Sequence, residues 1–196
     1  EKALNISKKI NGSEHPDTAL YFNNIGSIYY SLKQFNQALS YHRKALEIRK
    51  AILGEANVDV AASYNNIGTI YNDLGEYDKA LECYARVLNI CIPLLGENHL
   101  QVATCYNNMG LSYDYKGDYD KGLAYFQKSL AIAQQLFGER HTQVALCYNN
   151  IGYICQLRRQ YQEALAYYEK ALNIYTAISG SNHPNVALCY NNIGMV

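Results

Sequence analysis

The sequence predicts an all-α protein, a solenoid of antiparallel helix pairs, because it combines a fixed repeat with apolar stripes and regularly placed glycines. An asparagine pair begins at positions 23, 65, 107, 149 and 191, so the period is 42 residues without insertion or deletion. A constant period of this size is typical of stacked units that bury one continuous core. We therefore expect each repeat to bury its apolar surface against its neighbours.

Each repeat is expected to contain two helices, as residues 57–98 illustrate. Tyr64 and Tyr71 belong to an apolar stripe at helical spacing, which predicts a first helix, called helix A. After Gly75 the segment "YDKALECYARVLNI" shows a second stripe of the same period, which predicts helix B. Pro93 lies within helix B and is expected to kink or shorten it.

Histidines and glycines recur with the repeat. Histidines one repeat apart are too distant to share a metal or a proton, and they precede helix A, so we expect them to cap it; before Pro184 the cap is Asn182 or His183. A glycine at one phase of helix A faces a small residue of helix B and predicts close helix packing. The histidines are 15, 99, 141 and 183; the glycines are 26, 68, 110, 152 and 194, facing Ala38, Ala80, Gly122 and Ala164.

Composition and motifs exclude several classes of function. Seventeen basic residues balance seventeen acidic ones without a charge run, which argues against a nucleic-acid or anionic membrane partner. No stretch approaches a membrane span, and "EKALNISKKI" resembles an amphipathic helix more than a signal peptide, so we expect a cytoplasmic protein. The six cysteines fall on apolar phases without metal-ligand spacing, so no metal or cofactor is expected. Phosphate-loop and nucleophile-elbow motifs are absent, so we expect no catalytic site and no enzyme activity in these residues.

The repeated pattern Y-x-x-[IM]-G-x-x-Y, followed by [YF]-x-x-A-L and K-A-L-x-I, resembles the tetratricopeptide repeat, and the 42-residue length with "LGE.H" linkers is similar to kinesin light chains. The resemblance covers the whole chain and implies a right-handed α-solenoid, a superhelix whose A helices line a concave groove. It also implies a generic interaction scaffold for a protein or extended peptide. The departures are Cys155 for a helix-A tyrosine, Lys33 and Arg159 for the turn glycine, and His42 for a helix-B aromatic.

The repeat boundaries predict one array fragment over residues 1–196. The opening "EKALNI" is identical to residues 169–174, in the middle of a helix B, so both ends are expected to be cut within a repeat. Such ends would expose apolar surface and favour end-to-end self-association. The expected units are 1–14 (helix B only), 15–56, 57–98, 99–140, 141–182 and 183–196 (helix A only).

The second asparagine of each pair is the main candidate for ligand binding. Successive helical residues turn by about 100°, which places this residue opposite the buried stripe and the first asparagine on its flank. It matches the asparagine ladder of superhelical tetratricopeptide proteins, in which an amide bridges the N–H and C=O of an extended ligand. The alternative is that the amides tie neighbouring helices together. The second asparagines are Asn24, Asn66, Asn108, Asn150 and Asn192; the flanking candidates are Asn65, Asn107 and Asn149.

Specificity is expected from positions that differ between repeats on the same face. One row contains Ser27, Thr69, Leu111 and Tyr153; a second contains Tyr30, Asn72, Asp114 and Gln156; a third contains Ser31, Asp73, Tyr115 and Leu157. These rows contain no lysine or arginine and become more apolar toward the C-terminal end. We therefore predict a peptide-binding scaffold for a largely neutral segment with an apolar anchor near Tyr115 and Tyr153. The alternative is a structural spacer or self-packing segment of a larger protein.

Overall fold

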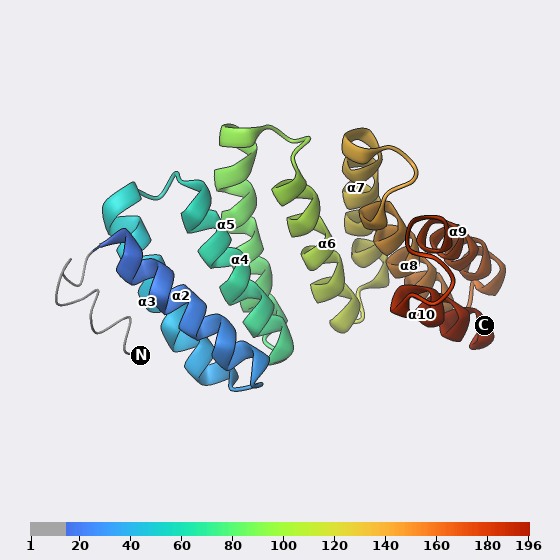
Figure 1. The fold of residues 1–196 in the computed structure, drawn as a ribbon, viewed down its shortest axis with the longest axis horizontal. Coiled ribbons are helices and arrows are strands. Elements are labelled where there is room, and N and C mark those ends of the chain that lie inside the picture. The colour runs from blue at the N-terminus through green and yellow to red at the C-terminus, as the bar shows by residue number, and fades with distance from the viewer. Residues whose placement is uncertain (1–14) are drawn as a thin grey trace. The chain divides into compact units, whose positions relative to one another are not determined.

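The computed structural model describes residues 15–196, and in this part of the chain every regular element is an α-helix (Figure 1). The all-α prediction is confirmed, while the helix expected within residues 1–14 lies outside the described residues. The A helices have 16 residues, except for an 11-residue last one, and the B helices have 19. They are α2 (Pro16–Ser31), α3 (Phe35–Leu53), α4 (Val58–Asp73), α5 (Tyr77–Leu95), α6 (Leu100–Tyr115), α7 (Tyr119–Phe137), α8 (Thr142–Leu157), α9 (Tyr161–Ser179) and α10 (Pro184–Gly194).

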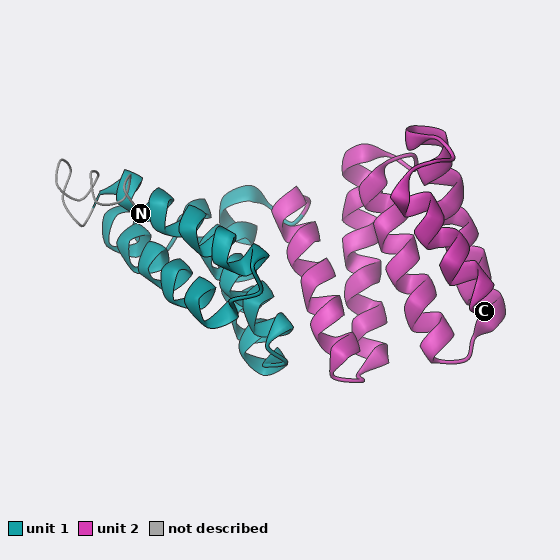
Figure 2. Cartoon of the chain, turned by 60° about the horizontal axis from the view of Figure 1, so that its bottom comes forward, with its two compact units in different colours: residues 1–97 teal, residues 98–196 magenta. Residues whose placement is uncertain are grey.

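The chain divides into two compact units, residues 1–97 and 98–196 (Figure 2). In unit 1, helix α3 packs against α2 and α4, and α5 packs against α4. In unit 2, the same consecutive packing joins α6, α7, α8, α9 and α10. Each unit is therefore a stack of helix pairs in which an element contacts its neighbours in sequence, as a solenoid requires.

A polar side chain starts each described A helix. The Nδ1 atom of a histidine accepts a hydrogen bond from the backbone N–H two residues later, at 3.2 Å, which satisfies one of the free donors of the first turn. The residues are His15, His99, His141 and His183, so the cap before Pro184 is the histidine and not Asn182. In α4 the same position is taken by Asn57, whose Oδ1 accepts from the Asp59 N–H at 2.8 Å.

The turn between helix A and helix B requires a left-handed residue. Gly75 and Gly117 have φ of 75° and 78° there, and Lys33 and Arg159 have φ of 59° and 61° at the equivalent positions. A side chain in this conformation costs about 1 kcal/mol, so the two basic residues keep the turn at some expense of stability.

Pro93 lies in the last turn of α5, which is as long as the other B helices, so the expected shortening is wrong.

Close packing within each pair depends on the repeated glycine of helix A. A Cβ atom on Gly68 would lie 2.7 Å from the Tyr84 ring, and one on Gly110 would lie 2.6 Å from the Phe126 ring. The expected close approach is confirmed, but the nearest group is the helix-B ring instead of a small residue, because the ring lies directly over the glycine. This ring belongs to His42, Tyr84, Phe126 and Tyr168 in the four complete repeats.

Candidate functional site

The asparagine pairs form hydrogen bonds between repeats. The Nδ2 atom of the second asparagine donates to Oδ1 of the first asparagine of the preceding repeat, 43 residues earlier. The distance is 3.1 Å from Asn66 to Asn23 in unit 1; in unit 2 it is 2.9 Å from Asn150 to Asn107 and 2.8 Å from Asn192 to Asn149. The amides therefore tie neighbouring A helices together, which is the alternative that the sequence left open.

These bonds use only part of the hydrogen-bonding capacity of the second asparagine. A primary amide offers two N–H donors and a carbonyl oxygen with two lone pairs. Asn66 and Asn150 each use one N–H, and the described part of the chain donates no hydrogen bond to their Oδ1 atoms. Both side chains are half-buried, while Asn24 is exposed and Asn192 is buried. The second asparagine can thus bind a neighbouring repeat and still present donor and acceptor atoms to solvent.

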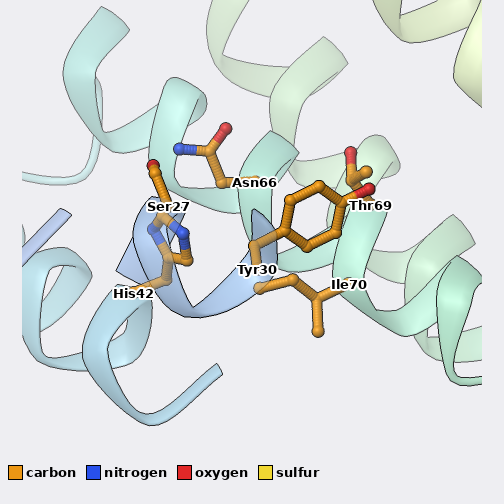
Figure 3. A pocket seen from close by; sticks show the side chains of 6 residues that line it. All are labelled: Ser27, Tyr30, His42, Asn66, Thr69 and Ile70. Carbon is orange, nitrogen blue, oxygen red and sulfur yellow. The ribbon is translucent and has the colours of Figure 1, made fainter. Parts of the chain in front are cut away.

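In unit 1, a small polar cavity lies beside Asn66, which donates the hydrogen bond to Asn23. Figure 3 shows the side chains that line it. It measures about 90 Å³ and is framed by two successive A helices and the helix B between them. Of the candidates for ligand binding, Asn66 and Thr69 line this cavity. Asp73 is exposed and does not line it. The backbone oxygen of Asn65 accepts a hydrogen bond from the Thr69 hydroxyl at 3.1 Å. The lining residues are Ser27, Tyr30, His42, Asn66, Thr69 and Ile70.

His42 is the buried polar group of this cavity, and the sequence identified it only as a departure from the repeat. Its side chain is 3% exposed, and burial together with the nearby Arg49 charge lowers the pKa of the imidazole to about 4. The ring is therefore neutral at pH 7. Its Nδ1 lies 3.2 Å from Asn23 Oδ1, which can only accept, so Nδ1 carries the proton and donates it. Asn23 Oδ1 thus accepts from both His42 and Asn66.

The A helices of unit 2 carry apolar side chains at several of the positions predicted to set specificity. We call Leu111, Tyr115, Tyr153 and Leu157 the unit 2 patch. Tyr115 and Tyr153 are 55% and 43% exposed, Leu157 is exposed at the end of α8, and Leu111 is half-buried against the core. The Asn150 to Asn107 bond joins α6 and α8, the two helices that carry the patch. The structure thus brings the predicted aromatic positions to the surface of one unit.

Asp114 is a buried carboxyl beside this patch. At the equivalent positions Asn72 donates to the Tyr84 hydroxyl at 3.5 Å and Gln156 accepts from the Tyr168 hydroxyl at 2.8 Å. The equivalent ring in the third repeat, Phe126, has no hydroxyl. Asp114 is only 8% exposed, and burial raises the pKa of its carboxyl to about 6. The repeat therefore retains an acid where its neighbours have a satisfied amide.

The described residues offer little for metal chemistry. No group of three histidine, cysteine, aspartate or glutamate side chains within residues 15–196 could hold a metal ion. All six cysteines are free thiols; five are buried and Cys83 is half-buried. In the same part of the chain, none of the helices has the length and apolar character needed to cross a membrane.

Sequence comparison identifies the family. A sequence model described as "Tetratricopeptide repeat" matches residues 1–51, 59–121, 107–177 and 148–196. The chain belongs to the tetratricopeptide repeat family. No curated protein matches this tetratricopeptide repeat chain significantly in sequence.

Solved structures share the fold of this tetratricopeptide repeat chain at low identity. BtubC (BKLC) from P. vanneervenii superposes with a TM-score of 0.83 and 22% identity over 99% of this chain and 78% of that one. A kinesin light chain-type protein of P. anserina with nearly identical TPR-like repeats gives 0.77 and 18% over 92% and 86%. The apo form of RapI gives 0.73 and 21% over 89% of this chain and 66% of its own. At these identities the likeness establishes the fold alone.

Proposed function

We propose that this chain is a non-catalytic scaffold that binds a protein partner by holding an extended segment against its A helices. The observation that carries the proposal is the unused capacity of the ladder amides. Asn66 and Asn150 keep a carbonyl oxygen and one N–H after forming the bond between repeats. An extended peptide offers one donor and one acceptor per residue, so such amides can bind it without reading its side chains.

The unit 2 patch would supply the selection that the amides lack. Tyr115 and Tyr153 bury large apolar area at low entropic cost when a partner covers them, and tyrosine is enriched at interfaces for this reason. The patch contains no charged side chain, which favours a neutral or apolar anchor residue in the ligand. In unit 1, the polar cavity beside His42 would favour a polar side chain at the matching point of a ligand.

A second candidate function is a structural spacer that packs on its own protein or on another copy. The bonds from Asn150 to Asn107 and from Asn192 to Asn149 favour it, because they give the pair a role within the stack. In this function the asparagines would fix the spacing of repeats and bind no ligand.

One pair of variants separates these functions. Asn107→Ala removes the acceptor of the inter-repeat bond but leaves the Asn150 amide, whereas Asn150→Ala removes both the bond and the amide. We expect similar losses of stability, about 1 kcal/mol each, because both lose the same hydrogen bond. Binding to an array of extended peptides, measured by fluorescence polarisation for each hit, should fall at least fivefold more for Asn150→Ala than for Asn107→Ala.

Equal peptide affinity of the two variants would mean that the asparagine ladder is not part of the ligand site. If no peptide binds and sedimentation shows concentration-dependent assembly of the wild-type chain, the spacer function replaces the proposal. We place either function in the cytoplasm, where the six unpaired cysteines would stay reduced.

A further inference from the structure

A tyrosine of helix B fills the same place in three of the four complete repeats. Tyr41 stacks on Tyr29 with ring centroids 5.3 Å apart, and Tyr125 stacks on Tyr113 at 5.4 Å. The same tyrosine also contacts the aromatic residue that directly precedes the asparagine pair of helix A, with ring centroids 6.0 Å apart for Tyr41 and Phe22. The helix-B ring of the first repeat thus contacts both helix-A rings, Phe22 and Tyr29. Such ring pairs stabilise the packing beyond the apolar area that they bury.

A lysine one turn later on helix B covers these rings. Lys128 Nζ lies 5.4 Å from the Tyr106 centroid and 5.1 Å from that of Tyr125. Lys170 lies 5.3 Å from both Tyr148 and Tyr167. The position therefore attracts a planar ring through both stacking and cation–π contact.

The second repeat has Cys83 where the others have this tyrosine. Its two helix-A rings, Tyr64 and Tyr71, are both present, but no helix-B ring stands between them. An open cavity of about 510 Å³ lies at this place, lined by both tyrosines, by Ile67 of α4 and by Cys83. The cavity lies wholly within unit 1 and is formed by α3, α4 and α5.

Two cations lie over the ring of Tyr71, a lining residue of this cavity that is 7% exposed. The Arg43 guanidinium lies 6.0 Å from the centroid of Tyr71 and donates a hydrogen bond to its hydroxyl. Lys79 Nζ lies 5.5 Å from the same centroid. A guanidinium stacks readily on planar groups and attracts the negative face of a ring, so this rim complements an aromatic guest.

We propose that the cavity at Cys83 is a docking site for a tyrosine side chain presented by a partner protein. The guest ring would take the place that Tyr41, Tyr125 and Tyr167 occupy in their own repeats, stacking on Tyr71 beside Arg43. The site uses Tyr64, Ile67 and Tyr71, whereas Asn66 and Thr69 line the other cavity of α4. It is therefore a second surface, independent of the asparagine ladder.

N-acetyl-tyrosinamide is the probe, titrated into the full chain. Cys83 is the only half-buried cysteine among the six, so maleimide labelling reports on this place, although burial raises the pKa of its thiol to about 11 and slows the reaction. We expect saturable protection of Cys83 from labelling at millimolar probe, and at least tenfold weaker protection by N-acetyl-leucinamide. Labelling that the tyrosine probe does not slow overturns the proposal.

Repeat-swap variants test the shape of the cavity. Cys83→Tyr fills it with the chain's own ring and should abolish probe binding in a chemical-shift titration while raising the melting temperature. Cys83→Ser keeps the cavity and should bind as the wild type does, because the thiol itself has no role. Binding by Cys83→Tyr equal to that of wild type would overturn the proposal, as would loss of binding by a folded Cys83→Ser. Asn150→Ala should leave this binding unchanged, which separates it from the ladder.

Discussion

In unit 1 the ring that covers the helix-A glycine of the first described repeat is the imidazole of His42, whereas in unit 2 the rings at this position are those of Phe126 and Tyr168. Apart from the shorter α10 of unit 2, the A helices have the same length in both units, and so do the B helices. What changes is the surface beside the ring: a polar cavity next to His42 and an apolar patch of Tyr115 and Tyr153. The contrast between the two surfaces comes from their own side chains, because the positions of Leu111 and Tyr115 in unit 2 hold Thr69 and Asp73 in unit 1, on helices of the same length.

The largest effect should come from filling the space between glycine and ring in each unit. Gly110→Ala would place a Cβ 2.6 Å from the ring of Phe126, which is 1% exposed and cannot move aside. We expect a loss of about 2–3 kcal/mol in the free energy of unfolding, measured in urea. Gly26→Ala should cost less, because the His42 ring borders a cavity into which it can shift.

Gly194→Ala is the matched control, since nothing lies within 4 Å of the position of its Cβ. It should leave stability unchanged or raise it by about 0.5 kcal/mol through better helix propensity. Equal stability of Gly110→Ala and Gly194→Ala would show that the ring does not limit the approach of the helices.

Asp114→Asn should stabilise the protein at neutral pH. The folded-state pKa of about 6 lies above the ordinary value of 3.8, so the ionised carboxyl destabilises the folded state above pH 6. For the wild type, this cost disappears as the pH falls from about 6 to about 4. The amide should therefore gain about 1–2 kcal/mol at pH 7.5 and nothing near pH 4, measured by urea unfolding across this range. Phe126→Tyr, which supplies the missing hydroxyl, should give part of the same gain.

His42 should give the stability a smaller pH dependence in the opposite direction, and His42→Phe should remove it. The folded-state pKa of about 4 lies below the ordinary value of 6.5, so the neutral imidazole contributes stability above pH 6.5 that is lost as the pH falls toward 4. Between pH 7 and 5 the wild type should lose about 1 kcal/mol through this group, and the phenylalanine variant should not.

Amide hydrogen exchange in the two units would measure directly how their local stabilities differ in pH dependence. On acidification from pH 7 to 5, protection in α2 and α3 should fall relative to protection in α6 and α7, after correction for intrinsic exchange rates. A parallel change in both units would mean that neither His42 nor Asp114 titrates as its surroundings require.

Much of the stack was predictable, because helical phase depends only on sequence spacing. The 42-residue period located the helices and put Asn66 and Asn150 opposite the apolar stripe. The partner of each amide could not be predicted, because it depends on the offset between successive A helices. The glycines were correctly expected at a close contact, but their neighbour is a ring, since side-chain torsions and not spacing decide where Tyr84 or Phe126 lies.

The sites with the most unusual chemistry were the least predictable from sequence. His42 and Cys83 each interrupt an aromatic position of helix B, and this interruption was the only signal available. Neither spacing nor composition could show that one residue borders a polar cavity of about 90 Å³ and the other an open one of about 510 Å³. Whether a missing ring leaves a void depends on how far the surrounding side chains relax into it.

The bond between asparagines always joins residues 43 positions apart, one more than the period. Deleting any 42 residues from within the array would bring a second asparagine to the same distance from a new first asparagine, and the bond would form again. Inserting a duplicated repeat would do likewise. Every junction between repeats therefore uses the same contact. Recombination can lengthen or shorten such a protein by whole repeats without the need for a new one.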